Sequence, residues 1–304
     1  MSAIDPTKFV RRCIIGCLLA GLSTVLAHAG VADLKAADSL RAKYAELRSR
    51  LGSNQFQKPL HLESSESPDG VAGDIHALVD HPLSTAAAAL TSPGDWCEIL
   101  ILHINTKYCR ASTDGHGSVL HVSIGKKFDQ PLDQAYRVDF AYRVVAQSSD
   151  YLQIRLNSDQ GPLSTRDYRI VFEAIPVDGG RTFMHLSYSY AFGMAGRLAM
   201  QIYLGTAGRS KVGFTVAVTQ ADGRPLHIGG TRGVVERNTM RYYLAIEAFL
   251  GALSEPPQAQ LEKRLRDWFA AAERYPRQLH EMGEGEYLEM KRKEHQRQQV
   301  VLLR

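Results

Sequence analysis

The chain has 304 residues, of which 44% are hydrophobic and 22% charged, and its formal net charge at pH 7 is +4. The basic residues are interspersed with acidic ones and do not gather on one stretch. This distribution argues against nucleic acid as a partner.

Residues 1–29 have the organisation of a secretory signal peptide. Basic residues between positions 8 and 12 precede an apolar run that ends in Ala27-His28-Ala29, a small-x-small cleavage site. The run is short for a membrane span, and nothing after it holds about 20 consecutive apolar residues. We therefore expect a soluble periplasmic or secreted protein, cleaved near Ala29.

Two other kinds of export signal resemble this segment. Ile14-Ile15-Gly16-Cys17 resembles a lipoprotein box, and Arg11-Arg12 resembles a twin-arginine signal. Most of the apolar stretch follows Cys17, whereas in a lipoprotein signal it precedes the acylated cysteine. Ordinary signal cleavage is therefore the favoured interpretation.

Residues 30–57 predict an N-terminal helix. In "ADSLRAKYAELRSRL", Leu40, Tyr44 and Leu47 recur at helical spacing. Ser39 and the following Gly-Ser-Asn group supply plausible ends. We expect this helix to pack on the outside of the main domain or to link to it.

Residues 58–253 are expected to form the main domain. It opens with a short strand, "KPLHLESSES", and a helical stretch entered at His81-Pro82. Strand-like runs then follow at 100–111, 118–128, 134–149, 150–158, 165–177 and 181–193. Consecutive strands with no helices between them predict an antiparallel meander. The stretch over 194–218 is ambiguous, readable as a helix followed by a strand.

Two of the four cysteines, Cys97 and Cys109, remain after signal cleavage. An even pair in an oxidising compartment predicts a disulfide, worth roughly 3 kcal/mol in the loop-entropy model. A fully extended run between them would hold their Cα atoms roughly 40 Å apart, so the bond requires a turn or helix end within residues 100–104. Two buried free thiols are the alternative. A metal site is not expected, because no second Cys or His pair stands nearby at ligand spacing.

The longest helical pattern of the main domain is "RGVVERNTMRYYLAIEAFLGAL" at 232–253, with apolar residues on more than one face. After Pro256-Pro257, residues 254–304 predict a C-terminal helical extension. Its first helix places Leu261, Leu265, Trp268 and Phe269 on one stripe. The charge-dense end is either a frayed helix or a docking tail.

The order of elements over residues 58–253 resembles the START-like or Bet v 1-like superfamily, also called the helix-grip fold. The resemblance rests on one strand, a helical segment ending in "DWCEIL", a run of antiparallel strands and a long C-terminal helix. It implies an α+β fold in which a curved sheet surrounds that helix and leaves a cavity. The family's ligands are mostly sterols, phospholipids, polyketides and other hydrophobic compounds. The flanking helices and the long 194–218 stretch depart from the simplest members.

The resemblance implies that the long helix contributes to a ligand site, with aromatic residues of the strands opposite. The residues assigned to ligand binding are His103, Asn105, Tyr142, Tyr188, Tyr190, Arg232, Tyr242, Ile246 and Phe249. A solid core without a cavity is the alternative. Arg232 follows a Gly-rich turn at a helix N-terminus, where it could hold an anionic headgroup, although such a turn more commonly only reverses the chain.

Polar residues of the predicted strands are the other candidates for the site. Strand alternation puts His103 and Asn105 on one face, and likewise His185, Ser187 and Ser189 on one face of a later strand. If either face points inward, it supplies oriented hydrogen-bonding groups in an apolar pocket. The alternative is that both polar faces meet solvent.

Nothing in the sequence assigns catalysis. It has no G-x-S-x-G elbow, P-loop or G-x-G-x-x-G motif, and its paired histidines are five residues apart, unlike metal ligands. We therefore assign no catalytic residue, metal or cofactor. The favoured function is an exported binding or carrier protein for a hydrophobic small molecule, with transient membrane contact left open and no protein partner identified. The alternatives are a cyclase or hydratase using a His, Tyr or Arg in the cavity, and an interaction protein acting through its terminal helices.

Overall fold

The computed structural model describes residues 33–206 and 208–302. The predicted signal peptide and its cleavage site near Ala29 lie outside these residues. Within them, no helix combines the length and the apolar composition needed to cross a membrane.

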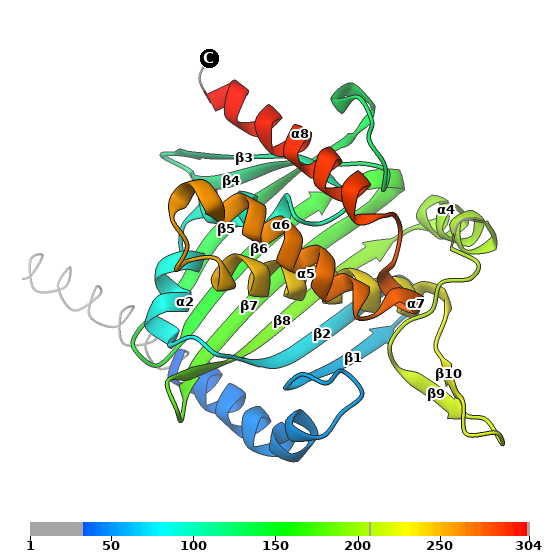
Figure 1. The fold of residues 1–304 in the computed structure, drawn as a ribbon, viewed down its shortest axis with the longest axis horizontal. Helices are drawn as coiled ribbons and strands as arrows, with labels where there is room; N and C mark the ends of the chain where they lie inside the picture. Colours follow the sequence, from blue (N-terminus) through cyan, green and yellow to red (C-terminus); the bar gives the residue numbers. More distant parts are fainter. Residues whose placement is uncertain (1–32, 207, 303–304) are drawn as a thin grey trace, which may run out of the picture.

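An antiparallel sheet of eight strands forms the centre of the fold, in the order β1-β2-β8-β7-β6-β5-β4-β3 (Figure 1). Strands β3 to β8 are neighbours in space in the order of the sequence, which confirms the predicted meander. β2 pairs with β8, so that β1 and β3 lie at the two edges. The strands are β1 (Leu60–Glu66), β2 (Gly70–Val79), β3 (Thr106–Asp114), β4 (Gly117–Ile124), β5 (Tyr136–Gln147), β6 (Leu152–Gln160), β7 (Thr165–Val177) and β8 (Arg181–Phe192).

Helix α5 (Gly230–Gly251) lies across one face of the sheet and encloses the main hydrophobic core with it (Figure 1). The predicted long helix is therefore confirmed. A strand beneath it, β2, is not predicted from the sequence, because "GVAGDIHALV" contains two glycines and two alanines. Gly73 has a packing role there: a Cβ would lie 2.5 Å from Thr239 Oγ1 of α5, so glycine permits close approach of helix and sheet.

Helices α2 (Leu83–Leu90) and α3 (Pro93–Leu100) connect β2 to the far edge of the sheet and form the predicted helical stretch. Ser92 caps α3, because its Oγ accepts a hydrogen bond from the Asp95 amide at 3.4 Å. The chain then turns over residues 101–105, and β3 begins only at Thr106. The predicted strand over 100–111 is wrong in its first half, where buried apolar residues end a helix.

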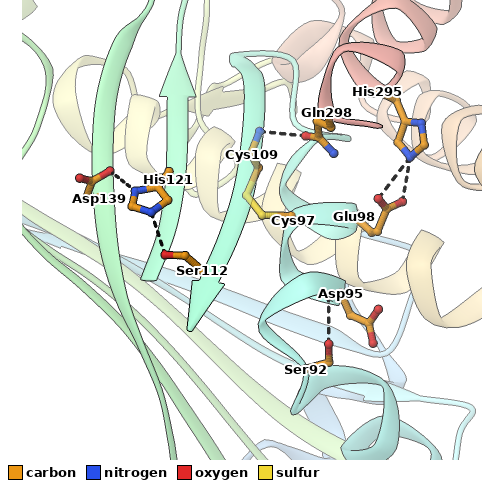
Figure 2. The surroundings of a disulfide bond; sticks show 10 residues. All are labelled: Ser92, Asp95, Cys97, Glu98, Cys109, Ser112, His121, Asp139, His295 and Gln298. Atoms are coloured by element: carbon orange, nitrogen blue, oxygen red, sulfur yellow. Dashed lines mark hydrogen bonds and ion pairs between the residues drawn. A yellow bond between two sulfur atoms is a disulfide. The ribbon is translucent and has the colours of Figure 1, made fainter. Parts of the chain in front are cut away.

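Cys97 of α3 and Cys109 of β3 form a disulfide with their Cα atoms 5.2 Å apart (Figure 2). The turn that this bond requires within residues 100–104 is present. The backbone amide of Cys109 also donates to Gln298 Oε1 of the C-terminal helix at 2.9 Å. The disulfide thus joins α3 to the edge strand beside that helix.

The N-terminal helix, residues 33–52, packs on the other face of the sheet, as expected for a helix outside the main core. Its Leu40 and Leu47 are buried in a second apolar cluster that contains Phe183 of β8. The helix ends at the predicted Gly-Ser-Asn group. The predicted start at Ser39 is wrong, because that residue lies inside the helix.

The stretch after β8 contains helix α4 (Met194–Gly205) and a separate hairpin of β9 (Val216–Thr219) and β10 (Pro225–His227). The interpretation of this stretch as a helix followed by a strand is correct. Both elements lie at one end of the sheet, on the right of Figure 1. Short 3-10 helices at Leu132–Gln134 (η1) and Pro162–Ser164 (η2) complete the loops of the sheet.

The C-terminal extension consists of α6 (Pro257–Glu273), α7 (Pro276–Leu279) and α8 (Glu284–Leu302). Leu265 and Trp268 of α6 are buried in the main core, and the partly buried Leu261 and Phe269 pack against it. His295 of α8 lies 3.2 Å from the Glu98 carboxylate of α3 (Figure 2). The apolar stripe is thus used within the chain, which removes one of the two observations that favoured an interaction protein; the other, the terminal "VVLLR", has its side chains outside the described part of the chain.

Candidate ligand-binding cavity

A cavity of ≈ 300 Å³ lies between the sheet and the part of α5 from Val234 to Tyr242, and α4 covers its side. The residues that line it come from the turn before β3, the sheet, η2, α4 and α5. They are His103, Asn105, Thr106, Ile124, Pro162, Leu163, Thr165, Tyr168, Tyr188, Tyr190, Gly196, Ala199, Met200, Tyr203, Val234, Asn238 and Tyr242. Most of these side chains are apolar or aromatic, as in ordinary small-molecule sites.

Regular spacing brings the walls together. Val234, Asn238 and Tyr242 are four residues apart on α5 and therefore share one face of the helix. Tyr188 and Tyr190 are two residues apart on β8 and point to the α5 side of the sheet. These two spacings place five lining residues opposite one another.

Small residues let α4 lie close over the opening. A Cβ on Gly196 would lie 3.1 Å from the Phe192 Cβ and 3.3 Å from the Leu163 carbonyl oxygen, so α4 packs tightly against the end of β8 and η2. Ala199, one turn further on, faces the cavity with a side chain too short to fill it. The hollow therefore depends on small side chains in the covering helix.

The aromatic wall is made of stacked and tilted tyrosines. The rings of Tyr168 and Tyr190 are stacked with centroids 5.2 Å apart, and those of Tyr188 and Tyr242 are tilted at 5.2 Å. Burial raises the pKa of Tyr188 well above its usual value and that of Tyr168 in the same direction. These phenols are therefore neutral at physiological pH, and a ligand in the cavity would contact their rings and hydroxyl groups.

His103 is the most unusual lining residue. Its Nδ1 accepts a hydrogen bond from the Asn105 amide at 3.2 Å, so the neutral ring carries its proton on Nε2. That Nε2 is buried and has no hydrogen-bond partner among the described residues. Burial and the charges of Arg241 and Lys291 hold the pKa of His103 well below its usual value. The ring, stacked on Tyr242 with centroids 4.6 Å apart, is thus a neutral, unsatisfied donor.

Tyr203 of α4 brings a second polar group to the cavity. Lys127 Nζ donates to its hydroxyl oxygen at 3.3 Å. Burial raises the pKa of Tyr203, but Lys127 and Arg237 outweigh that effect and bring it below its usual value. Asn105 is held in place, because its Nδ2 donates to the Gly125 carbonyl at 2.7 Å.

Five of the nine residues assigned from the sequence line this cavity: His103, Asn105, Tyr188, Tyr190 and Tyr242. The first two do so from the turn before β3, which the disulfide predicted, and not from the face of a strand, as alternation predicted.

The other four assigned residues lie elsewhere. Tyr142 donates to the Leu90 carbonyl at 3.0 Å, in the core against α2. Arg232 binds the side chain and the carbonyl of Ser64 on β1, at 3.1 and 3.0 Å. Ile246 and Phe249 are buried in the solid part of the core. None of these four residues lines the cavity, and along α5 the lining extends only from Val234 to Tyr242.

Several lining residues are not predicted from the sequence, namely Tyr168, Met200, Tyr203, Val234 and Asn238. Tyr168 alternates with Ile170 and Phe172 along β7, so the inward face of that strand was a usable signal. Tyr203 and Met200 belong to α4, whose position over the cavity has no local pattern in the sequence.

The polar face of β8 points away from the cavity, in agreement with the alternative of an outward-facing surface. His185 lies 2.9 Å from the Asp74 carboxylate and 3.0 Å from that of Glu173, and it stacks on His76. Burial lowers its pKa, but the two carboxylates raise it to about 9. Both ring nitrogens are occupied, so this network stabilises the sheet and leaves no nitrogen for proton transfer.

Other hollows of the described chain have more charged walls. Hollows of ≈ 660 and ≈ 460 Å³ contain charged residues such as Asp114 and Arg143, or Lys58 and Glu247. In the part of the chain that the structure describes, no three His, Cys, Asp or Glu side chains are placed to hold a metal ion. The mainly apolar cavity beneath α4 is therefore the candidate site.

No family model matches the chain, and no curated protein matches it. Solved structures similar to it include the aromatase/cyclase Zhui from Streptomyces sp. R1128, with 13% identity over 68% of this chain and 95% of that chain and a TM-score of 0.35. Norcoclaurine synthase from Thalictrum flavum has 12% identity over 48% and 76%, with a TM-score of 0.31. Human StAR-related lipid transfer protein 5 has 8% identity over 57% and 89%, with a TM-score of 0.31.

The strand order and the position of α5 decide the fold. The chain has the α+β helix-grip fold. α5 lies against one face of the sheet, over β1, β2 and β8, and the additions to the helix-grip core are the N-terminal helix, α4 with its hairpin, and helices α6 to α8.

Proposed function

We propose that this protein binds a small hydrophobic molecule in the cavity between α5 and the sheet, as a carrier or binding protein. The observation that supports this most directly is a hollow with largely apolar walls and a few fixed polar groups. Its volume of ≈ 300 Å³ is at the lower end of the roughly 300–1,000 Å³ of ligand pockets. A compound with a short chain or a few fused rings fits this volume better than a two-chain phospholipid.

Native mass spectrometry of the protein purified from its own host tests the proposal. We expect a bound apolar compound that organic extraction releases, and displacement of a fluorescent fatty-acid probe by it. Absence of any bound compound, together with no probe binding, would contradict a carrier function.

We also propose export to the periplasm or the exterior. The order of basic and apolar residues before Ala29 supports it, and so does a disulfide between the two cysteines that would remain. N-terminal sequencing of the protein from a periplasmic fraction should begin near Gly30. An intact Met1 on protein found only in the cytoplasm would contradict export.

A transient membrane contact through α4 belongs to the same proposal. Met194, Leu198 and Ile202, four residues apart, are 91%, 58% and 59% exposed on its outer face. Between Phe192 and Val235 the chain has five basic residues and one acidic residue, which favours an anionic lipid surface.

Vesicles that contain phosphatidylglycerol test this contact by co-sedimentation. Leu198→Gln should weaken binding several-fold, because it removes apolar area from the stripe. Leu34→Gln is the matched control, since Leu34 is 63% exposed on the helix of the opposite face. Equal behaviour of both variants would contradict a membrane role for α4.

An enzyme of the cyclase or hydratase kind is the second candidate. The observation that favours it is the pair of ionisable groups in the cavity, His103 and Tyr203, since the pKa of Tyr203 lies below its usual value. Such an enzyme should catalyse deuterium exchange into an enolisable β-dicarbonyl compound, as measured by NMR. Tyr203→Phe should remove that exchange, and no exchange above the buffer rate in the wild type would count against it.

A further inference from the structure

One end of the cavity is backed by more positive charge than its carboxylates balance. Glu281, which precedes α8, accepts Lys127 Nζ at 2.6 Å and Arg241 NH2 at 2.7 Å, and Lys211 Nζ lies 3.7 Å away. We call these four residues the Glu281 cluster. Arg241 is only 2% exposed, and its Nε has no hydrogen-bond partner among the described residues.

A second group of charges lies between α8 and the start of β3, beside the turn that carries His103. Glu294 binds Lys107 Nζ at 2.9 Å and Lys291 Nζ at 2.8 Å, and all three side chains are fully buried. Five cations therefore share two carboxylates in these two groups. Arg237 on α5 adds a sixth cation, which is buried and donates to the Val212 carbonyl at 3.1 Å. Of the six, Lys127 and Lys211 are partly exposed, at 25% and 17%.

Glu236, a buried carboxylate on α5, does not neutralise this excess of positive charge. Glu236 accepts hydrogen bonds from the amides of Phe214 and Thr215, at 2.6 and 3.0 Å, and forms no ion pair within the described residues. Burying a charge without a counter-charge is strongly unfavourable. The excess of cations is therefore expected to have a partner that the chain itself does not supply.

Three cations contact the polar lining of the cavity directly. Lys127 reaches the Tyr203 hydroxyl at 3.3 Å, and Lys291 Nζ donates to the His103 carbonyl at 2.7 Å. Arg241 NH1 donates to Asn238 Oδ1 at 3.4 Å. His103, Asn238 and Tyr203 are thus lining residues with a positive charge behind each of them.

We propose that the ligand carries one acidic group, a carboxylate or a phosphate, and that this group is bound at the end of the cavity formed by His103, Asn238 and Tyr203. The unpaired Nε2–H of His103 and the Asn238 amide provide donors there, and the surrounding cations favour negative charge. The apolar part of the ligand lies along Tyr168 and Tyr190. This inference rests on the proposed function and names the class of ligand.

Ligands of equal chain length and different charge test the inference. Isothermal titration calorimetry with decanoate, decyl phosphate and decan-1-ol compares two acids with a neutral alcohol. We expect at least one acid to bind about tenfold more tightly than the alcohol. The reason is that two opposite charges a few ångströms apart attract more strongly in a partly buried site than in bulk water. The more tightly bound acid identifies the group.

Two variants locate the effect. Lys127→Gln should remove most of the preference for the acid and leave the affinity for decan-1-ol unchanged. Lys126→Gln is the matched control, because Lys126 is the exposed neighbour that lies over the Phe128 ring, 5.4 Å from its centroid. Tyr203→Phe, which removes only a hydroxyl, serves if Lys127→Gln does not fold, and it should reduce the same preference.

Each outcome has a defined meaning. Equal affinity for the acids and the alcohol would overturn the inference and leave the proposed function intact. A Lys126→Gln effect as large as that of Lys127→Gln would also overturn it, because long-range charge would then explain the preference. If none of the three ligands binds, the proposed function fails and the inference fails with it.

Discussion

The two ends of α5 face the same sheet but have different neighbours. Ile246 and Phe249 in the C-terminal half are in a solid core, where the Arg264 guanidinium lies 4.2 Å from the centroid of the Phe249 ring. Val234 and Tyr242, which are nearer the N-terminus of the helix, line the cavity. We refer to these as the core end and the cavity end. An apolar helix face alone does not distinguish them, because the difference comes from the small residues of α4 that cover only the cavity end.

The largest effect is expected at the core end. Phe249→Ala should lower the free energy of unfolding by about 3–5 kcal/mol, because the ring is buried and the space it leaves cannot collapse fully. Urea denaturation monitored by fluorescence measures the change. Ligand affinity of the folded variant should stay close to that of the wild type. A large loss of affinity would show that the two ends are not independent.

Reduction of the disulfide should affect both ends. It should lower the free energy of unfolding by roughly 3 kcal/mol in the loop-entropy model. Because the bond lies beside the turn that carries His103, we also expect weaker ligand binding. Thermal melting with and without reductant measures the first effect and calorimetry the second. Two alkylatable thiols in the native exported protein would contradict the bond itself.

Two neighbouring valines on α5 separate the core end from the cavity end. Val235 is fully buried, and its Cγ2 would lie 3.4 Å from a Cβ on Gly73, so Val235→Phe should cost about 1–3 kcal/mol through overpacking. Val234→Phe points its ring into the cavity and should change stability by less than about 1 kcal/mol while it abolishes ligand binding. If Val234→Phe is as destabilising as its neighbour, the cavity end is not hollow.

The smallest effect is a change in pH dependence. The pKa of His103 is depressed in the folded state, so the unfolded chain binds more protons and stability falls as pH decreases below about 6.5. His103→Asn should remove about 1 kcal/mol of the loss between about pH 6.5 and 5.5. The unfolding free energy measured at several pH values gives the slope.

His185 provides the control with the opposite sign. Its pKa is raised to about 9, so its contribution is present below about pH 6.5 and is lost as pH rises through about 9. His185→Gln should therefore change the alkaline side of the stability profile. An unchanged acid side in His103→Asn would contradict the buried, neutral state of His103.

The periodicity of apolar residues and the number of cysteines were enough to predict much of the fold from the sequence. The meander, the long helix and the Cys97–Cys109 pairing all follow from such local or compositional patterns. β2 was missed, because Gly73 is chosen for close approach to Thr239, a tertiary requirement that lowers strand propensity. The strand expected at His103 was wrong, because an isoleucine-rich run suits a buried helix end as well as a strand.

The site was predicted in part for similar reasons. Tyr188 and Tyr242 lie on regular inward faces and could be found by alternation or helical spacing. The charged cluster behind the cavity could not be predicted, because Lys127, Arg241 and Glu281 are far apart in the sequence and no spacing relates them. Their proximity is a property of the folded chain alone.

The bonds from α8 to the cavity turn have a consequence for the order of events during synthesis. Tyr287 Oη donates to the Leu102 carbonyl at 2.8 Å and Lys291 Nζ to the Thr106 carbonyl at 2.8 Å, each across 185 residues of chain. A ribosome that adds about 5–20 residues per second needs roughly 10–40 s to make that intervening chain. During this time the two carbonyls have water as their partner, and the turn that carries His103 lacks its contacts with α8. The turn that carries His103 is therefore fixed only after α8 has been made and has docked.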